Sequence, residues 1–356
     1  MALMTLLLTC SAGAASHVLY FHRFECHMHA TKYLNVLLLV FVANVIVLTK
    51  AYNVSLVPAI TTTTAPLLSY LTGLYASLMV YRLFLNPLNR YPGPYAARIS
   101  SLWWSFQLGK SDGYLKLKDL HDGYGPIVRI GSSDLSIIDP DFMEPTFGLH
   151  ALSSKSYWYD NDKPYSSMHT TRSRALHDKR RRVWAPAFSD KALRDYETTI
   201  DRYNETLVQR ITDFHGGPVN VRKWFNLWSF DVMGQLAFGK DYGMLESGEK
   251  HAALGLLSEG MQPLALMLPT WMFRILTQIP FLGAGFQKFV KFCIQELSWR
   301  VENANVVAKG KDGRLDIMGW ILKAYQDVDK PQRETLLQAD TRLIIVAGYA
   351  TVLMTR

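Results

Sequence analysis

Residues 343–356 read LIIVAGYATVLMTR and predict the second half of a long apolar helix. The helix is expected to begin after Asp329, because Pro331 then falls in the first turn, where proline is well tolerated. Glycine inside a helix costs roughly 1 kcal/mol of helix stability relative to alanine, so Gly348, which leaves this helix face flat, should have a structural or functional reason. Close packing of another helix and a flat ligand both explain it. One face, spaced i, i+3, i+4 and i+7, holds Ile344, Ala347, Gly348 and Thr351.

Composition sets broad limits on the class of protein. The chain has 356 residues, enough for more than one domain, and only three cysteines, which excludes a disulfide scaffold and suits a reducing compartment. The formal net charge is +8, but the positive residues are clustered. The net charge therefore does not by itself indicate a nucleic-acid partner.

The first 85 residues predict a membrane region with two or three transmembrane helices. Residues 34–49 and 65–87 are apolar and nearly uncharged, and each approaches the roughly 20 residues that a helix needs to cross a bilayer. A pair of buried core helices is the alternative. Residues 2–21 give a weaker signal, which fits a third span, a signal peptide cleaved at Ala12-Gly13-Ala14, or neither.

The distribution of positive charge predicts the orientation in the membrane. Loop 22–33 and the chain after residue 85 carry more Lys and Arg than loop 50–64, so the first two are expected to be cytosolic and the last lumenal. Two glycosylation sequons test this topology, because Asn53 would be lumenal and Asn204 cytosolic. Sugar on Asn204 but not on Asn53 would contradict it.

Two other segments raise the question of a binding site. Residues 22–29, HRFECHMH, contain three histidines and a cysteine, but the spacing fits no standard zinc pattern, so we predict an interfacial loop and no metal site. Residues 172–182, RSRALHDKRRR, are strongly basic. Three interpretations of this basic segment are open: it is a solvated helix face, it binds nucleic acid, or some of its arginines bind a buried anion. No aromatic platform or groove-binding motif accompanies them, so no nucleic-acid partner is expected.

The order of elements predicts a mainly α fold with a small β part. Prolines and a glycine in residues 86–94 predict a stiff, proline-rich hinge between membrane region 1–85 and a globular part, 95–356. Two short β-branched runs, 126–131 and 133–139, predict a strand, a turn and a strand. Helices are expected over 111–124, 175–186, 190–214, 223–237, 250–267, 284–308, 315–327 and 331–356.

Five segments in order make the sequence resemble a fungal microsomal cytochrome P450. They are YRLFLNPLNRYPGP (81–94), YGPIVRIGSSDLSIIDP (124–140), HDKRRRVWAPAFSDKALRDYE (177–197), NVRKWFNLWSFDVMGQLAFGKDYGML (220–245) and LLQADTRLIIVAGYAT (336–351). The resemblance covers residues 80–356. It implies the N-terminal portion of the cytochrome P450 fold, preceded by transmembrane helices and ending within the helix that the family calls I.

The resemblance also implies roles for five residues. In the family's C helix a Trp-x-x-x-Arg pattern binds a haem propionate, and the matching positions are His177 and Arg181, which share a helical face. In the I helix the family pattern is Ala/Gly-Gly-x-Asp/Glu-Thr. Ala347 and Gly348 would leave room for haem and oxygen, and Thr351 would assist proton delivery to bound dioxygen. Position 350 is alanine where the family has an acid, so a carboxylate relay is missing.

The family's Glu-x-x-Arg pair and its haem-ligand cysteine loop follow the I helix and are not in this sequence. None of Cys10, Cys26 and Cys293 has the glycine and arginine neighbours of that loop, so no metal ligand is predicted. The resemblance implies haem iron, electrons from NADPH through a cytochrome P450 reductase, a lipophilic small-molecule substrate, and an endoplasmic reticulum membrane location with the globular part cytosolic.

Three hypotheses about activity follow from these observations. The first is a truncated monooxygenase that is inactive as this chain. The second is a non-enzymatic membrane protein that binds a partner or a lipophilic ligand. The third is weak haem binding without a thiolate. A reduced, carbon-monoxide-bound spectrum separates the third from a haem-thiolate enzyme.

Overall fold

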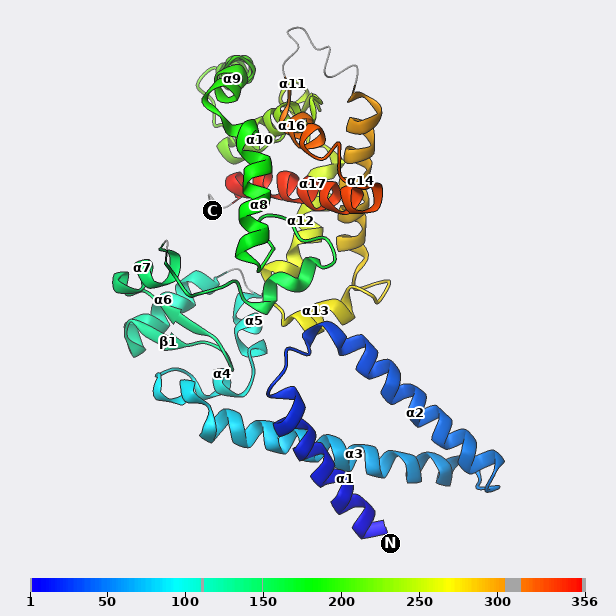
Figure 1. Ribbon diagram of the computed structural model, residues 1–356. Helices are drawn as coiled ribbons and strands as arrows, with labels where there is room; N and C mark the ends of the chain where they lie inside the picture. Colours follow the sequence, from blue (N-terminus) through cyan, green and yellow to red (C-terminus); the bar gives the residue numbers. More distant parts are fainter. Residues whose placement is uncertain (1, 110–111, 149, 305–314, 354–356) are drawn as a thin grey trace. The chain divides into compact units, whose positions relative to one another are not determined.

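The computed structural model describes residues 2–109, 112–148, 150–304 and 315–353 (Figure 1). Within them, the side chains of residues 2, 253–254, 257–258, 262–263 and 348–353 are not described. The described part of the chain is mainly helical and contains one two-stranded antiparallel sheet, as the sequence predicted. It divides into two compact units, which are described in turn: residues 1–153 with 263–279, and residues 154–262 with 280–356.

Unit 1 begins with three helical stretches that are long and apolar enough to cross a membrane, Leu3–Phe21, His27–Lys50 and Leu56–Arg90. Their α-helical parts are α1 (Ala2–Ser16), α2 (Ala30–Lys50) and α3 (Leu56–Val80), and the π-helical turns η1 (His17–Phe21) and η3 (Tyr81–Leu85) extend α1 and α3. Helix α1 packs along α3, and α2 forms a hairpin with α3 (Figure 1). The sequence predicts two or three spans, and the stretch at Leu3–Phe21 is the segment for which it also allows a signal peptide.

The rest of unit 1 is built from short elements. The two predicted strands are present, and Val128 pairs with Ser136 in the antiparallel register. The proline-rich segment contains one 3-10 turn and no α-helix, and a further short helix, α13, enters the unit from residues 263–279. The elements are η2 (His27–His29), η4 (Pro87–Arg90), α4 (Tyr95–Ile99), α5 (Leu102–Leu108), α6 (Gly113–Tyr124), β1 (Ile127–Arg129), β2 (Leu135–Ile137), η5 (Pro140–Phe142), α7 (Met143–Phe147) and α13 (Thr270–Leu276).

The proline-rich segment 86–94 lies against β1. The Arg129 backbone N–H donates to the Pro92 carbonyl at 2.8 Å. Gly93 has φ +153°, and a Cβ there would lie 2.3 Å from the Arg129 carbonyl oxygen, so only glycine fits. The Arg129 side chain is fully buried and donates to Asn89 Oδ1. Buried hydrogen bonds therefore fix this segment to the sheet.

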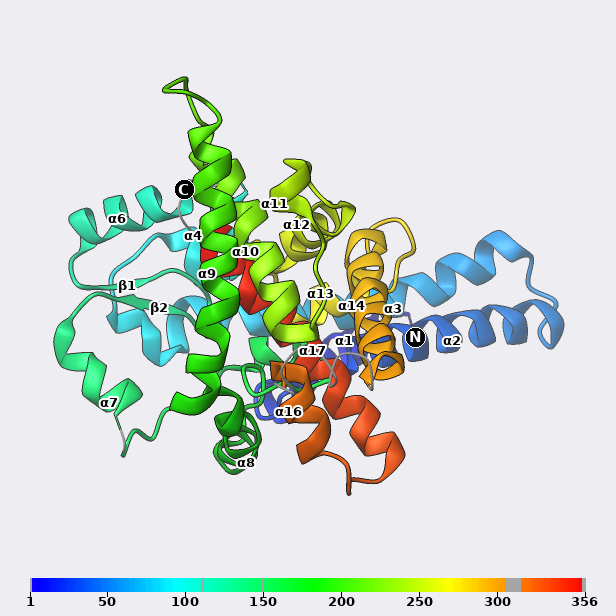
Figure 2. The same ribbon diagram turned by 90° about the horizontal axis from the view of Figure 1, so that it is seen from above.

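Unit 2 is helical, and its core surrounds α17 (Lys330–Leu353), which packs against α10, α14 and α16 (Figure 2). Trp184, Phe238, Met318 and Ile344 are buried together around this helix. The other elements are η6 (Tyr157–Asp162), α8 (Arg174–Trp184), η7 (Ala185–Phe188), α9 (Asp190–Thr212), α10 (Val221–Phe238), α11 (Met244–Ser247), α12 (Ala252–Ala265), α14 (Ala284–Glu302) and α16 (Ile317–Ala324).

Polar residues before the first turn position several of these helices. Ser173, Ser189, Asn220 and Asp316 each accept a backbone N–H of the first turn, at the starts of α8, α9, α10 and α16 respectively. Helix α10 ends at Gly239 in the left-handed region, with φ 66°, where glycine has no Cβ penalty. These local signals fix where α8, α9, α10 and α16 begin and where α10 ends. They therefore set the position of α8 and of the helices around α17.

Candidate functional site around helices α8 and α17

Helix α8 carries the basic cluster, and its arginines differ in environment. Arg180 and Trp184, four residues apart, are buried on one face. Arg181 and Arg182 are exposed, and His177 is half-buried. The cluster is therefore neither wholly a solvated face nor wholly a buried site.

Arg180 ties α8 to α17. Its Nη2 binds Asp340 Oδ1, and its Nη1 donates to the Ser166 carbonyl at 2.7 Å. The Tyr325 hydroxyl donates to the other Asp340 oxygen at 3.1 Å. Burial raises the pKa of Asp340, and the adjacent Arg180 guanidinium partly offsets that rise. One of the three interpretations of the basic cluster, an arginine on a buried carboxylate, is thus confirmed for Arg180.

A second ion pair, between a buried arginine and a half-buried aspartate, joins α17 to η6. Arg342 Nη1 binds Asp162 Oδ1, and the guanidinium carbon lies 4.4 Å from the centroid of the Tyr165 ring. Burial raises the pKa of Asp162 to about 6, against the opposing effect of Arg342. Asp160, on the same 3-10 helix, pairs with Arg172 at 3.0 Å. Charged groups therefore hold the loop before α8 to α17.

The predicted propionate ligands His177 and Arg181 lie on the accessible part of α8. His177 Nδ1 lies 3.0 Å from Asp178 Oδ1, and this hydrogen bond lowers the pKa of the Asp178 carboxyl. Within the described part of the chain, Arg181 has no hydrogen-bond or ion-pair partner. Its guanidinium can thus bind an anion without breaking a hydrogen bond within the protein.

The structure describes the predicted I-helix face only in part. Ile344 is buried in the core, and Ala347, one turn later, is exposed. The surroundings of Gly348 and the side chain of Thr351 are outside what the structure describes, although the helical backbone continues through Leu353. Beneath this helix lies an apolar cavity of about 20 Å³, too small for an organic ligand. Its lining is Phe230, Met233, Gly234, Phe238, Tyr242, Phe292, Ile344 and Ile345.

The cysteines do not fit the role of an iron ligand. Cys293 is buried in α14, and burial raises the pKa of its thiol, which disfavours the thiolate that binds metals. Cys10 lies in α1 and Cys26 just before η2, both in unit 1. Cys293 packs beside Ile345 and Val346 of α17, but as a buried thiol and not as a thiolate.

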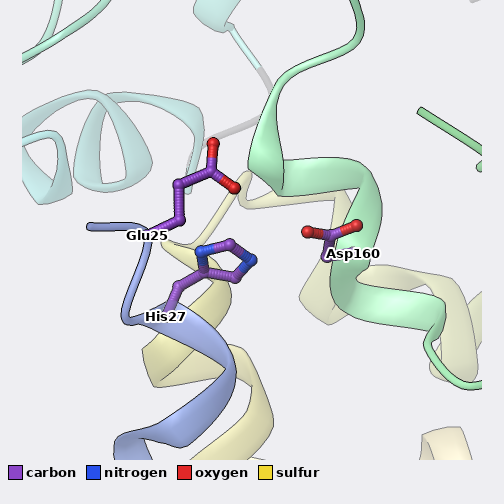
Figure 3. Close-up of side chains that lie close together, drawn as sticks. All are labelled: Glu25, His27 and Asp160. Atoms are coloured by element: carbon purple, nitrogen blue, oxygen red, sulfur yellow. The ribbon is translucent and has the colours of Figure 1, made fainter. Parts of the chain in front are cut away.

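The histidine-rich segment 22–29 gathers no metal site by itself in the part of unit 1 that the structure describes. Glu25 and His27 lie just before α2 (Figure 3), and the ring of His22 packs 4.3 Å from that of Tyr81. Asp160, also drawn in Figure 3, belongs to unit 2 and has its own partners there.

The comparison with known proteins identifies the family. The family model described as Cytochrome P450 matches residues 92–356. The chain belongs to the cytochrome P450 family. That assignment agrees with the observed fold, in which a short sheet precedes the α8 and α17 helices, and with the resemblance found in the sequence. No finding favours the non-enzymatic alternative.

Curated relatives of this P450 are fungal. The chain is 38% identical over 348 residues to cytochrome P450 monooxygenase lcsK of Purpureocillium lilacinum, covering 95% of this chain and 62% of the relative. It is 38% identical to cytochrome P450 monooxygenase notG' of Aspergillus versicolor, covering 96% and 61%. It is 35% identical to tryprostatin B 6-hydroxylase of Aspergillus fumigatus, covering 95% and 61%. The chain thus spans about three-fifths of the length of these relatives.

The family implies haem, and the residues present fit one part of that group. Arg181, an accessible and unpartnered cation among the described residues, suits a propionate, and His177 beside it can donate a hydrogen bond. The thiols present do not suit the iron. The sequence did not single out Arg180, whose burial was signalled by its i, i+4 spacing from Trp184 in an otherwise polar helix.

Proposed function

We propose that the protein carrying this chain is a haem-dependent monooxygenase that oxidises an apolar small molecule with dioxygen. The observation that carries the proposal is the family match over residues 92–356, which includes both α8 and α17. Relatives whose names state an activity are monooxygenases or a hydroxylase. Tryprostatin B is the substrate of one relative, and no particular substrate is assigned to this chain.

The candidate residues take three roles in this function. Arg181 and His177 bind the haem propionates from α8. Ala347 and Gly348 keep α17 flat where haem and oxygen lie, and the Thr351 hydroxyl moves a proton. The bound haem supplies the oxygen-activating chemistry. Because position 350 is alanine, Thr351 receives its proton from water or from another residue, and not from a neighbouring carboxylate.

The location of the protein and its electron supply follow from the same family membership. The three apolar helices anchor the protein in the endoplasmic reticulum membrane, with the globular part in the cytosol. Electrons come from NADPH through the membrane-bound reductase. Exposed Lys179 and Arg182 on α8 give a basic surface that suits an acidic redox partner.

A pair of neighbouring arginine variants tests the site. In the full-length product carrying this chain, Arg181→Ala should lower haem affinity by about tenfold or more, because a charge-assisted hydrogen bond contributes roughly 1.5–3 kcal/mol. Arg182→Ala, exposed on the same helix, should change it by less than about twofold. Haem content after dialysis against apomyoglobin measures the difference. Equal losses in the two variants would refute the assignment, and a product without haem would refute the proposed function.

A further inference from the structure

Helices α1 and α3 touch backbone to backbone at two glycines. A Cβ at Gly13 would lie 2.0 Å from the Tyr70 carbonyl oxygen, and a Cβ at Gly73 would lie 1.9 Å from the Cys10 carbonyl oxygen. Real side chains never approach backbone so closely. Small residues that let two helices approach are typical of interfaces between helices in membranes. The contact is therefore specific for glycine on both helices.

Hydrogen bonds between side chains and backbone of the two helices extend the glycine contact along their length. Each one joins α1 or η1 to α3, and together they span the length of the N-terminal helix. On α3, Ser69, Gly73 and Ser77 lie at i, i+4 and i+8, and so on one face. The contacts are Ser69 Oγ to the Leu6 carbonyl at 2.6 Å, Ser16 Oγ with Tyr70 OH at 2.8 Å, and His17 Nδ1 with Ser77 Oγ at 2.9 Å.

We infer that residues 2–21 are a permanent membrane helix, retained in the mature protein and docked on the α3 face formed by Ser69, Gly73 and Ser77. Hydrocarbon offers no partner to a polar group, so hydroxyls within a span are satisfied by a neighbouring helix. Cleavage after Ala14 would remove both the Leu6 carbonyl that Ser69 binds and the Cys10 backbone that covers Gly73.

The partner of this α3 face is thus the chain's own N-terminus. Helix α2 buries no side chain, and no hydrogen bond like these joins it to α3 among the described residues. With the orientation proposed above, three spans place the N-terminus in the lumen. The inference about docking itself depends only on the contacts between α1 and α3, and does not require haem or activity.

One engineered full-length chain tests retention and docking together. A protease site is inserted in the exposed turn at Asn53, between α2 and α3, and the native cysteines are changed to serine. His17→Cys is combined with Ser77→Cys on the docked face, or with Tyr75→Cys, which is exposed at nearly the same depth. After oxidation in microsomes, solubilisation and cleavage, non-reducing gels show whether a disulfide joins the fragments, and mass spectrometry gives the start of the N-terminal fragment.

The expected N-terminal fragment contains residues 2–21. Because a disulfide needs Cβ atoms about 4 Å apart, the 17/77 pair should cross-link at least about tenfold more than the 17/75 pair. Gly73→Ala should remove the 17/77 cross-link, and Thr72→Ala on the neighbouring position should retain it. A fragment that starts at Ala15, equal cross-linking of the two pairs, or no cross-link at 17/77 would overturn the inference.

Discussion

Replacing Asp340 by asparagine removes the carboxylate that Arg180 binds. Asparagine keeps the shape and can still accept the Tyr325 hydroxyl, so the change isolates the charge. Asp340 is fully buried and Arg180 is 7% exposed, so the guanidinium would remain in the core without a counter-charge. Breaking a buried pair in this way costs about 3–5 kcal/mol, a large part of a typical 5–15 kcal/mol of folding stability.

Arg180→Met gives a second and distinguishable result. It leaves Asp340 alone in the core, where burial already raises its pKa. A carboxyl whose folded pKa lies above its unfolded value favours folding at low pH, and this contribution is lost as the pH rises through the folded pKa. The cost of Arg180→Met should therefore shrink on acidification, whereas the cost of Asp340→Asn should not, because arginine does not titrate.

Pulse proteolysis of the full chain in urea, in detergent micelles, measures these costs. Arg182→Gln, on the exposed side of the same helix, is the control and should stay within about 0.5 kcal/mol of the wild type. The double variant Arg180→Met with Asp340→Leu should be less destabilised than either single variant. A cost below about 1 kcal/mol for Asp340→Asn would refute the reasoning, because the pair would then contribute as little as an exposed one.

Three further results are expected from other buried groups. Because the pKa of Asp162 is raised from 3.8 to about 6, the free energy of unfolding should fall by up to about 3 kcal/mol between pH 4 and 6, and Asp162→Asn should abolish that slope in urea titrations. Arg300→Met should lower the free energy of unfolding by about 3–5 kcal/mol, because Arg300 binds both oxygens of buried Asp316. Arg210→Met, at an exposed ion pair, should lower it by less than about 1 kcal/mol, and equal losses of stability in pulse proteolysis would contradict this. Cys293 should resist maleimide in the native chain and react after denaturation, and rapid native labelling would show that its thiol is not buried.

The main helices could be predicted because their signals are local. The expected helices 175–186, 190–214 and 223–237 lie within two residues of α8, α9 and α10 at each end. Ser173 and Ser189 cap the first two, and the apolar spacing marks their length. The two strands were predicted from β-branched runs around a turn, and these pair as expected.

Short helices were not predicted, because tertiary contacts stabilise them. Helix α13 has seven residues, too few to be stable alone, and its Thr270 and Phe273 are buried within unit 1. Helices α4, α5, α7 and α11 were missed for the same reason. The sequence likewise left the role of residues 2–21 open, because the partner that distinguishes a span from a leader lies more than fifty residues away, in α3.

The site was predicted only as far as the family pattern reaches. His177 and Arg181 follow from the spacing of that pattern and lie on the accessible side of α8, where their role stays a prediction. The partners of Arg180 and Arg342 could not be read from the sequence, because Asp340 and Asp162 lie 160 and 180 residues away from them. Such long-range charge pairs require the packed fold.

We propose that this chain supplies the propionate and oxygen sides of a P450 haem site, and that none of its cysteines is the iron ligand. The most direct test is the reduced, carbon-monoxide-bound spectrum of residues 1–356 expressed with haem. We expect the thiolate-type Soret band to be absent and Cys293→Ala to leave the spectrum unchanged. A thiolate-type band that disappears with Cys293→Ala would contradict it.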